Sequence, residues 1–280
     1  MTIDRELENQ IVDSVRRIAR EEILSRFREL GQGDIATKSR VDDLVTTADT
    51  AAEGRLAEMA QTLLPGVAVV GEEAVSSSPS VRDAIDSKTC LIVDPVDGTW
   101  NFAHGLATFG VILSLSENGR TQWGLIYDPV GDDWAVAARG DGARFVRASG
   151  ESAPLALGRD RSPKLDATIG YVHSYLFKGD ERRRLFPRLA EFHKTDALRC
   201  SAHEYRMLAL GIVDFCVSPV MNPWDHAAGC LIAEEAGGVA RLLDGTAYTP
   251  TVREGRLVVA SSEMAWTTVR DAITGPDGTI

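Results

Sequence analysis

The sequence predicts an α/β protein in which helices and sheets lie in layers. Three observations support this fold class. Two amphipathic helical patterns precede residue 65, short apolar strands joined by tight turns fill most of residues 90–146, and strands alternate with helices after residue 167. Because a sheet and an amphipathic helix each bury one apolar side against another element, this order of elements favours stacked layers.

The first 64 residues carry two helical patterns. Apolar residues recur at gaps of three and four between residues 4 and 30, which is typical of an amphipathic helix, and Gly31 is its expected end. The same spacing returns over residues 41–64 and stops at Pro65. We therefore expect two helices before the first strand.

Strands follow these helices. Residues 67–70 predict a short buried strand, and the Ser- and Asp-rich residues 74–87 predict a loop with one helical turn. Further apolar segments predict strands at residues 90–93, 110–115, 122–127, 134–138 and 143–146. Between two of them, Glu117-Asn118-Gly119-Arg120 is typical of a hairpin turn.

The second half of the chain alternates strands with helices. We expect strands at residues 167–172, 197–200, 213–217 and 257–260, and helices at residues 180–191, 203–210 and 224–236. The change in pattern near Gly150-Glu151-Ser152-Ala153-Pro154 predicts a boundary between one part at residues 1–155 and another at residues 156–280.

The composition is that of a globular protein without a basic surface. The chain has 280 residues, with 30 Lys and Arg against 41 Asp and Glu, so its formal net charge is −11. A protein that binds nucleic acid polymers non-specifically needs the opposite charge, so we expect none as a partner. Most of the carboxylates are expected simply to keep the protein soluble.

The cysteines indicate a reducing compartment. Cys90, Cys200, Cys216 and Cys230 are widely spaced and form no Cys-x-x-Cys pair, so we expect buried thiols instead of disulfides or a zinc site. The sequence also lacks an apolar run of about 20 residues and a signal-peptide pattern. We therefore expect a cytoplasmic protein that does not associate with membranes.

Asp94-Pro95-Val96-Asp97-Gly98-Thr99 carries the strongest chemical signal. It follows a buried strand, and a turn at Pro95 would let two carboxylates and the Val96 carbonyl converge. Hard oxygen ligands of this kind suit Mg²⁺ or Mn²⁺. Gly98-Thr99 would then expose backbone N–H groups at a helix start, which suits a phosphate. A plain Asp-Pro turn is the alternative that the motif alone leaves open.

Two other acidic segments favour the metal site. Glu72 and Glu73 also follow a buried strand, so an acid there can share the same sheet edge, although adjacent acids at a strand end are commonly just solvated. Asp225 falls in the first turn of an apolar helix that begins after Pro223. Stabilisation of the helix dipole is the alternative explanation for that aspartate.

Taken together, these motifs resemble the inositol monophosphatase family of Mg²⁺-dependent, lithium-sensitive phosphatases. Gly71-Glu72-Glu73, Asp94-Pro95-Val96-Asp97-Gly98-Thr99 and Trp224-Asp225 through Glu235-Ala236-Gly237-Gly238 match three family signatures in order. A fourth segment, from Lys38 through Asp43-Leu44-Val45-Thr46 to Asp49, matches the family's amino-terminal motif. The resemblance spans about residues 4–270.

The resemblance implies an αβαβα five-layer sandwich, a homodimer, and two or three Mg²⁺ ions for which Mn²⁺ is a possible substitute. By the family pattern the metal ligands are Glu72, Asp94, the Val96 carbonyl, Asp97 and Asp225, most of them in the part at residues 1–155. Thr99, Glu72 and Asp49 would orient the attacking water. Substrate would contact Asp97, Gly98, Thr99, Cys200, Ser201, Ala202, Ser218 and Asp225.

The chain departs from the family around the substrate. Ser218 stands where animal inositol monophosphatases have a glutamate that receives inositol hydroxyls, and Cys200-Ser201-Ala202 replaces the usual Gly-Ser/Thr-Ala segment. A serine cannot supply the charge-assisted hydrogen bond of a carboxylate. Trp100 also replaces a small or basic residue. These differences leave the phosphatase chemistry intact and the identity of the sugar open.

The function expected from this resemblance is hydrolysis of inositol 1-phosphate, or of a similar small polyol or sugar phosphate, by metal-activated water. Histidinol phosphate, fructose 1,6-bisphosphate and 3′-phosphonucleotides are the alternative substrates. A non-catalytic binding or regulatory protein on the same fold is a further alternative. That alternative predicts the loss of a metal ligand, whereas every expected ligand is present in the sequence.

Overall fold

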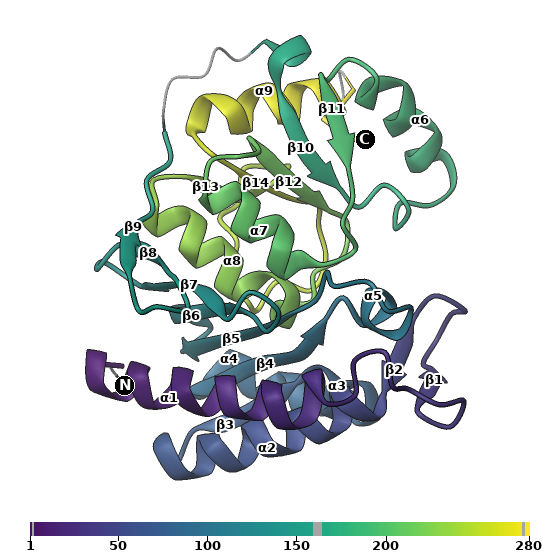
Figure 1. Cartoon of the computed structure of the whole chain (residues 1–280). Coiled ribbons are helices and arrows are strands. Elements are labelled where there is room, and N and C mark those ends of the chain that lie inside the picture. Colours follow the sequence, from purple (N-terminus) through teal and green to yellow (C-terminus); the bar gives the residue numbers. More distant parts are fainter. Residues whose placement is uncertain (2, 159–163, 276–277) are drawn as a thin grey trace.

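The computed structural model describes residues 1–280 except residues 2, 159–163 and 276–277. The structure consists of five stacked layers, which Figure 1 shows from bottom to top. A pair of helices, a seven-stranded sheet, a second pair of helices, a five-stranded sheet and a third pair of helices form the stack. This is the αβαβα sandwich expected from the sequence.

Within the described residues the bounds are as follows. The helices are α1 (Arg5–Ile18), continued by a π-helix (Ala19–Leu24), α2 (Thr47–Leu63), α3 (Glu72–Ser77), α4 (Ala84–Ser87), α5 (Thr99–Ala103), α6 (Gly179–Leu189), α7 (Ser201–Ala209), α8 (Pro223–Glu235) and α9 (Glu263–Ile273), with 3-10 turns at Pro79–Asp83 and Leu165–Ala167. The strands are β1 (Ile35–Thr37), β2 (Leu44–Thr46), β3 (Ala68–Gly71), β4 (Cys90–Asp97), β5 (Gly110–Glu117), β6 (Arg120–Asp128), β7 (Asp133–Ala138), β8 (Ala143–Val146), β9 (Ser152–Pro154), β10 (Ile169–Val172), β11 (Lys194–Asp196), β12 (Phe215–Ser218), β13 (Val239–Leu242) and β14 (Leu257–Ala260).

The seven-stranded sheet runs in chain order from β3 to β9. Strands β3 and β4 are parallel and every later neighbour is antiparallel. Helices α1 and α2 pack their apolar sides on one face of this sheet and bury residues such as Ile11, Leu56 and Trp123. The parallel pair places the ends of β3 and β4 at one edge, which is where the acidic motifs lie.

Helices α7 and α8 lie between the two sheets. They share a core with β6, β12 and β14 that contains residues such as Ile126, Leu231 and Val259. Gly124 of β6 allows α8 to approach closely, because a Cβ at this position would lie 2.8 Å from the Cα of Ala228. On the far side, α6 and α9 cover the five-stranded sheet, whose order is β11-β10-β12-β14-β13.

The seven-stranded sheet ends at Pro154 and the five-stranded sheet begins at Ile169. The two sheets nevertheless share the core around α7 and α8. The division into domains at residues 1–155 and 156–280 therefore stays a prediction.

Several predicted boundaries differ from the structure. The helix expected over residues 41–64 begins only at Thr47, because Leu44–Thr46 pairs with Ile35–Thr37 in a hairpin. Thr46 then caps the helix in a capping box with Asp49. The first helix is regular only to Ile18 and continues as a π-helix to Leu24. Helical periodicity alone does not separate a regular turn from a π-helical one.

Other differences concern short elements. The loop expected over residues 74–87 is largely helical, with α3, a 3-10 turn and α4. The strand expected at residues 197–200 lies instead at Lys194–Asp196, and β13 and α9 were not predicted. The strands β11 and β13 have only 3 and 4 residues, which carry too little periodicity to identify them from their own sequence, whereas the 11-residue helix α9 was missed for no such reason.

Candidate active site

One cavity of about 160 Å³ opens where β4, α5, α8 and the loop of the β1–β2 hairpin meet. Its walls bring together six separate segments of the chain. It is lined by Arg40, Asp42, Asp43, Leu44, Glu72, Asp94, Asp97, Gly98, Thr99, Trp100, Tyr175, Leu176, Arg199, Asn222 and Asp225. Six of the residues expected at the active site, namely Glu72, Asp94, Asp97, Gly98, Thr99 and Asp225, therefore share this cavity.

Asp94, Asp97 and Asp225 form the acidic centre of this cavity. One carboxylate oxygen from each lies within 4.8 Å of the others. Asp94 and Asp97 are on β4, whose pairing with β5 shifts register between them, so both side chains reach the same region instead of alternating across the sheet. Asp225 comes from the first turn of α8. Three carboxylates held this close repel one another unless a cation lies among them.

Asp97 is fixed by the N-terminal turn of α7. Its Oδ2 accepts hydrogen bonds from the Ala202 backbone N–H at 2.5 Å and from the Cys200 thiol at 3.1 Å. The next residue, Gly98, has φ +91°, and a Cβ there would lie 2.9 Å from the Thr108 carbonyl oxygen. Only glycine makes this turn without strain. The chain then enters α5 at Thr99.

Glu72 begins α3 at the end of β3 and pairs with Lys38. The Lys38 ammonium lies 2.8 Å from Glu72 and 2.5 Å from Glu73. Burial lowers the pKa of Lys38, but the two carboxylates outweigh it and raise the pKa well above its ordinary value. Lys38 therefore stays positively charged and partly compensates the acidic cavity.

Glu53 supports Glu72 from α2. Its carboxylate accepts hydrogen bonds from the backbone N–H groups of Glu73 and Ala74, each at 2.9 Å. Gly71 leaves the necessary space, since a Cβ there would lie 2.2 Å from the Glu53 Cδ. Glu53 belongs to none of the matched motifs, and a buried carboxylate on a helix that faces a glycine is not visible in sequence spacing.

We expect replacement of Glu53 by alanine to lower kcat about 10- to 100-fold, because α3 and with it Glu72 would lose their anchor. Glu53→Gln keeps one acceptor and should recover part of that loss. Steady-state kinetics across a Mg²⁺ titration measures both effects. Glu58→Ala, an exposed change on the same helix, is the matched control. Equal kinetics for Glu53→Ala and Glu58→Ala would contradict this role.

Asp49 and Thr99 form a hydrogen-bonded pair. The Thr99 hydroxyl lies 2.9 Å from Asp49 Oδ1 and 3.0 Å from the Val96 carbonyl oxygen. The other Asp49 oxygen accepts from the Thr46 backbone N–H and hydroxyl, which places this carboxylate at the buried start of α2. Thr99 is thus held with one lone pair free for a further donor.

Four aspartates of the site, Asp49, Asp94, Asp97 and Asp225, have a raised pKa. Burial raises the pKa of Asp49 to about 6, and it raises that of Asp97 to about 6 although hydrogen bonds from Ala202 and Cys200 oppose it. Burial, and then the charge of Glu72, raise the pKa of Asp94 and of Asp225 well above the usual range. The fold thus gathers several buried carboxyl groups whose ionisation is unfavourable, which is typical of a functional site.

These residues fit divalent metal ions. The carboxylates of Asp94, Asp97, Asp225 and Glu72 line the cavity and are hard oxygen donors, which Mg²⁺ and Mn²⁺ prefer. Val96 is buried outside the lining and its carbonyl accepts from Thr99, so its role as a ligand stays a prediction. Sequence reasoning had named all five. Of these five, the mutually close group consists of the three aspartates, while Glu72 lines the same cavity beside Lys38.

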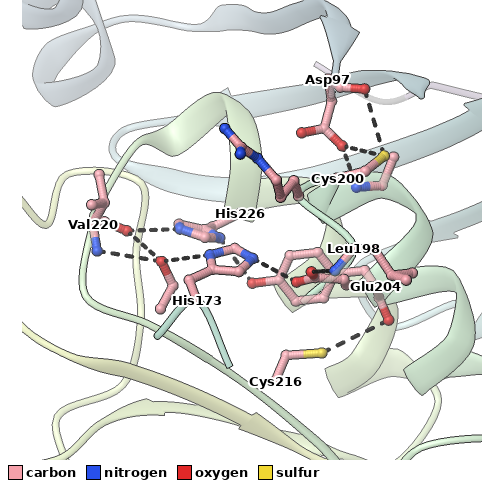
Figure 2. Close-up of polar contacts among 12 residues, drawn as sticks. Asp97, His173, Leu198, Cys200, Glu204, Cys216, Val220 and His226 are labelled. Carbon is pink, nitrogen blue, oxygen red and sulfur yellow. Dashed lines mark hydrogen bonds and ion pairs between the residues drawn. The ribbon is translucent and has the colours of Figure 1, made fainter. Parts of the chain in front are cut away.

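The residues expected to contact substrate fall into two groups. Cys200, Ser201 and Ala202 lie directly behind Asp97, and the Cys200 side chain is buried (Figure 2). Ser218 is also buried and outside the set that lines the cavity, with its hydroxyl bonded to the Val220 carbonyl at 3.2 Å. Asp97, Gly98, Thr99 and Asp225, in contrast, line the cavity itself.

A buried polar network underlies the site. His173 Nε2 lies 2.6 Å from Glu204, and Glu204 also accepts from the Leu198 backbone N–H at 2.7 Å (Figure 2). Glu204 thereby ties the segment before Cys200 to the first turn of α7. No motif in the sequence indicates this pair, because Glu204 and His173 lie 31 residues apart.

Comparison with known proteins agrees with this geometry. The profile of the Inositol monophosphatase family matches residues 4–273. An inositol-1-monophosphatase of Bacillus subtilis is 30% identical over 220 residues, which cover 77% of this chain and 78% of that protein. A fructose-1,6-bisphosphatase/inositol-1-monophosphatase of Thermotoga maritima is 29% identical over 213 residues, with 76% of each chain covered.

Two further comparisons concern proteins named for other roles. The Nus factor SuhB of Haemophilus influenzae is 29% identical over 240 residues, with 82% of each chain covered. The crystal structure of extragenic suppressor protein suhB from Bartonella henselae superposes with a TM-score of 0.80 at 22% identity, covering 97% of this chain and 99% of that one. The fold is therefore shared over nearly the whole chain.

The profile match over most of the chain, the curated relatives and the acidic cavity agree. The chain is a phosphatase that hydrolyses phosphomonoesters, in a metal-dependent family that acts on small phosphorylated substrates. It belongs to the inositol monophosphatase family.

Proposed function

We propose that this protein is a Mg²⁺-dependent phosphomonoesterase that hydrolyses inositol 1-phosphate or a similar small polyol or sugar phosphate. The observation that supports this most directly is the convergence of Asp94, Asp97 and Asp225 in one cavity with the Asp49–Thr99 pair. One group of residues is suited to holding cations, and the other is suited to orienting water. A direct hydrolysis needs both.

Two or three ions would be held by Glu72, Asp94, the Val96 carbonyl, Asp97 and Asp225. When bound, such ions lower the pKa of water and stabilise the charge on the transferring phosphoryl group. Lys38 adds a fixed positive charge beside Glu72. The repulsion among the carboxylates is thereby offset when the site is loaded.

Thr99 and Asp49 orient the nucleophile in this proposal. The Thr99 hydroxyl donates to Asp49, so its oxygen is left to accept a hydrogen bond from an attacking water. Asp49, with a pKa of about 6, is mostly ionised at neutral pH and can take up the proton that Thr99 passes on. No covalent intermediate on the protein is required.

The alcohol side of the substrate faces Trp100, Tyr175, Leu176 and Asn222 across the cavity. Residue 218 is a serine, so no carboxylate at that position receives sugar hydroxyls. The Ser218 hydroxyl is hydrogen-bonded to the Val220 carbonyl. Histidinol phosphate, fructose 1,6-bisphosphate and 3′-phosphonucleotides therefore stay alternative substrates. We further propose a cytoplasmic, lithium-sensitive homodimer. No described helix is long and apolar enough to cross a bilayer.

A phosphate-release screen tests the proposal. The purified protein would be assayed with inositol 1-phosphate, sugar phosphates, histidinol phosphate and 3′-phosphonucleotides, in Mg²⁺ or Mn²⁺ and with or without Li⁺. We expect Mg²⁺-dependent turnover of a polyol or sugar phosphate that Li⁺ suppresses. Light scattering on the same sample tests the homodimer.

A regulatory role is the second candidate, because one of the related proteins is named a Nus factor. It predicts a different result in the same screen. A protein that binds Mg²⁺ but releases phosphate from none of these compounds would favour that role and contradict the proposed catalysis.

A further inference from the structure

Arg199 lines the cavity, and its ion pair with Asp42 is long. Its guanidinium lies 3.5 Å from both the side-chain and the backbone oxygen of Asp42, which is the outer limit of a hydrogen bond. Its side chain is 27% exposed. A guanidinium has five N–H donors, so most of the donors of Arg199 are available to a molecule in the cavity.

Aromatic rings fix the position of this guanidinium. It lies 4.2 Å from the ring centroid of Trp100 and 5.1 Å from that of Tyr175. Both rings line the cavity with it. Contact with two rings holds the plane of the guanidinium without using its N–H groups.

The backbone of Arg199 is also held in a costly conformation. Its φ is +55°, which is uncommon for a long side chain. The buried Asn101 amide donates to the Leu198 carbonyl at 2.8 Å and to the Arg199 carbonyl at 3.4 Å. The fold therefore keeps a strained backbone in place, and that conformation directs this side chain to the two rings.

Trp100 has no free face for a ligand. One face carries Arg199, and His104 stacks on Trp100 with 4.2 Å between ring centroids and 26° between planes. Trp100 thus serves as a platform for Arg199 and not as a stacking surface for a nucleobase. The available chemistry at this end of the cavity is the guanidinium edge.

Arg40 and Arg199 bring positive charge to the mouth of an otherwise acidic cavity. Arg40 and Arg199 both line it, and both contact the same carboxylate, Asp42, at 3.3 and 3.5 Å. Asp43 also lines it, and its carboxylate accepts from Ser39. Two arginines and two aspartates line this mouth, so it has no net formal charge, whereas Glu72, Asp94, Asp97 and Asp225 of the same cavity are all acidic.

We propose that Arg199, stacked between Trp100 and Tyr175, is a specificity-determining residue that binds a second anionic group, phosphate or carboxylate, on the alcohol part of the substrate. This inference rests on the proposed function. The preferred phosphomonoester then carries two anionic groups, one at the metal ligands and one at Arg199. Neutral polyol phosphates are poorer substrates.

Matched substrates test this directly. Glycerol 2-phosphate and 2-phosphoglycerate differ only in a hydroxymethyl against a carboxylate, and fructose 1-phosphate and fructose 1,6-bisphosphate differ by one phosphate. We expect a kcat/KM at least about tenfold higher for the doubly anionic member of a pair, as for one charged hydrogen bond. Arg199→Gln should remove that preference mainly through KM, and Arg199→Lys should keep part of it.

Asp42→Asn is the control for a merely structural role. It removes the carboxylate that Arg199 contacts in the hairpin loop and leaves the guanidinium in place, so the preference should persist. The inference is overturned if Arg199→Gln lowers kcat/KM equally for both members of each pair, if Asp42→Asn reproduces its effect, or if the wild type favours the neutral members. Turnover of inositol 1-phosphate without such a preference refutes this inference alone, whereas no turnover of any phosphomonoester refutes the proposed function as well.

Discussion

Replacement of Asp97 by asparagine is expected to lower kcat by more than about 100-fold while the fold persists. Changes to groups that merely support a metal ligand already cost about 10- to 100-fold, so the loss of a ligand should exceed that. The asparagine oxygen can keep the hydrogen bond from the Ala202 N–H, which leaves the amide NH₂ turned toward Asp94 and Asp225. Two N–H donors would then face the place of the cations.

The measurement is phosphate release at saturating Mg²⁺, with circular dichroism to confirm folding. Asp180→Asn is the matched control, because Asp180 is an exposed residue of α6 that is not among the residues lining the cavity. Undiminished Mg²⁺-dependent turnover by the Asp97→Asn variant would refute the assigned role.

The metal-free protein is expected to lose stability as the pH rises from about 4 to about 6. Asp97 and Asp49 each have a pKa of about 6 in the folded protein, against about 3.9 in an unfolded chain. The folded state therefore binds protons more tightly, and its advantage disappears as these groups ionise. Each carboxyl then costs roughly 3 kcal/mol above pH 6.

Mg²⁺ should reverse this loss, because cations among the ionised carboxylates offset their repulsion. We expect the Mg²⁺-induced rise in Tm to be larger at pH 7.5 than at pH 5. Thermal unfolding in EDTA and in Mg²⁺ at both values measures it. The Asp97→Asn variant isolates the effect, since its metal-free form should be more stable than the wild type at pH 7.5 and about equal below pH 4. An equal Mg²⁺ effect at both pH values would contradict this prediction.

The layered fold and the acidic centre were predictable because they depend on local sequence. Asp94 and Asp97 share one strand end, and Asp225 opens an apolar helix, so spacing alone places them at element ends. The matched motifs then supplied their order along the chain.

The supporting residues were not predictable, because their roles depend on contacts between distant parts of the sequence. Glu53 acts on backbone groups 20 residues away, and Arg199 reaches Trp100 across 99 positions. Strand β2 was assigned to a helix and its partner β1 was not predicted, because three-residue strands have no periodicity of their own. Such contacts are set by packing, which spacing along the sequence does not encode.

The acidic centre combines residues from two different layers of the fold. Asp94 and Asp97 belong to the seven-stranded sheet, and Asp225 belongs to the helix packed between the sheets. Loop closure over 128 residues separates Asp97 from Asp225, so a chain with only one sheet formed has no complete set of ligands. The ability to bind the cation, and with it hydrolysis, therefore requires that α8 has docked on the seven-stranded sheet, so that activity reports on the assembly of these two parts.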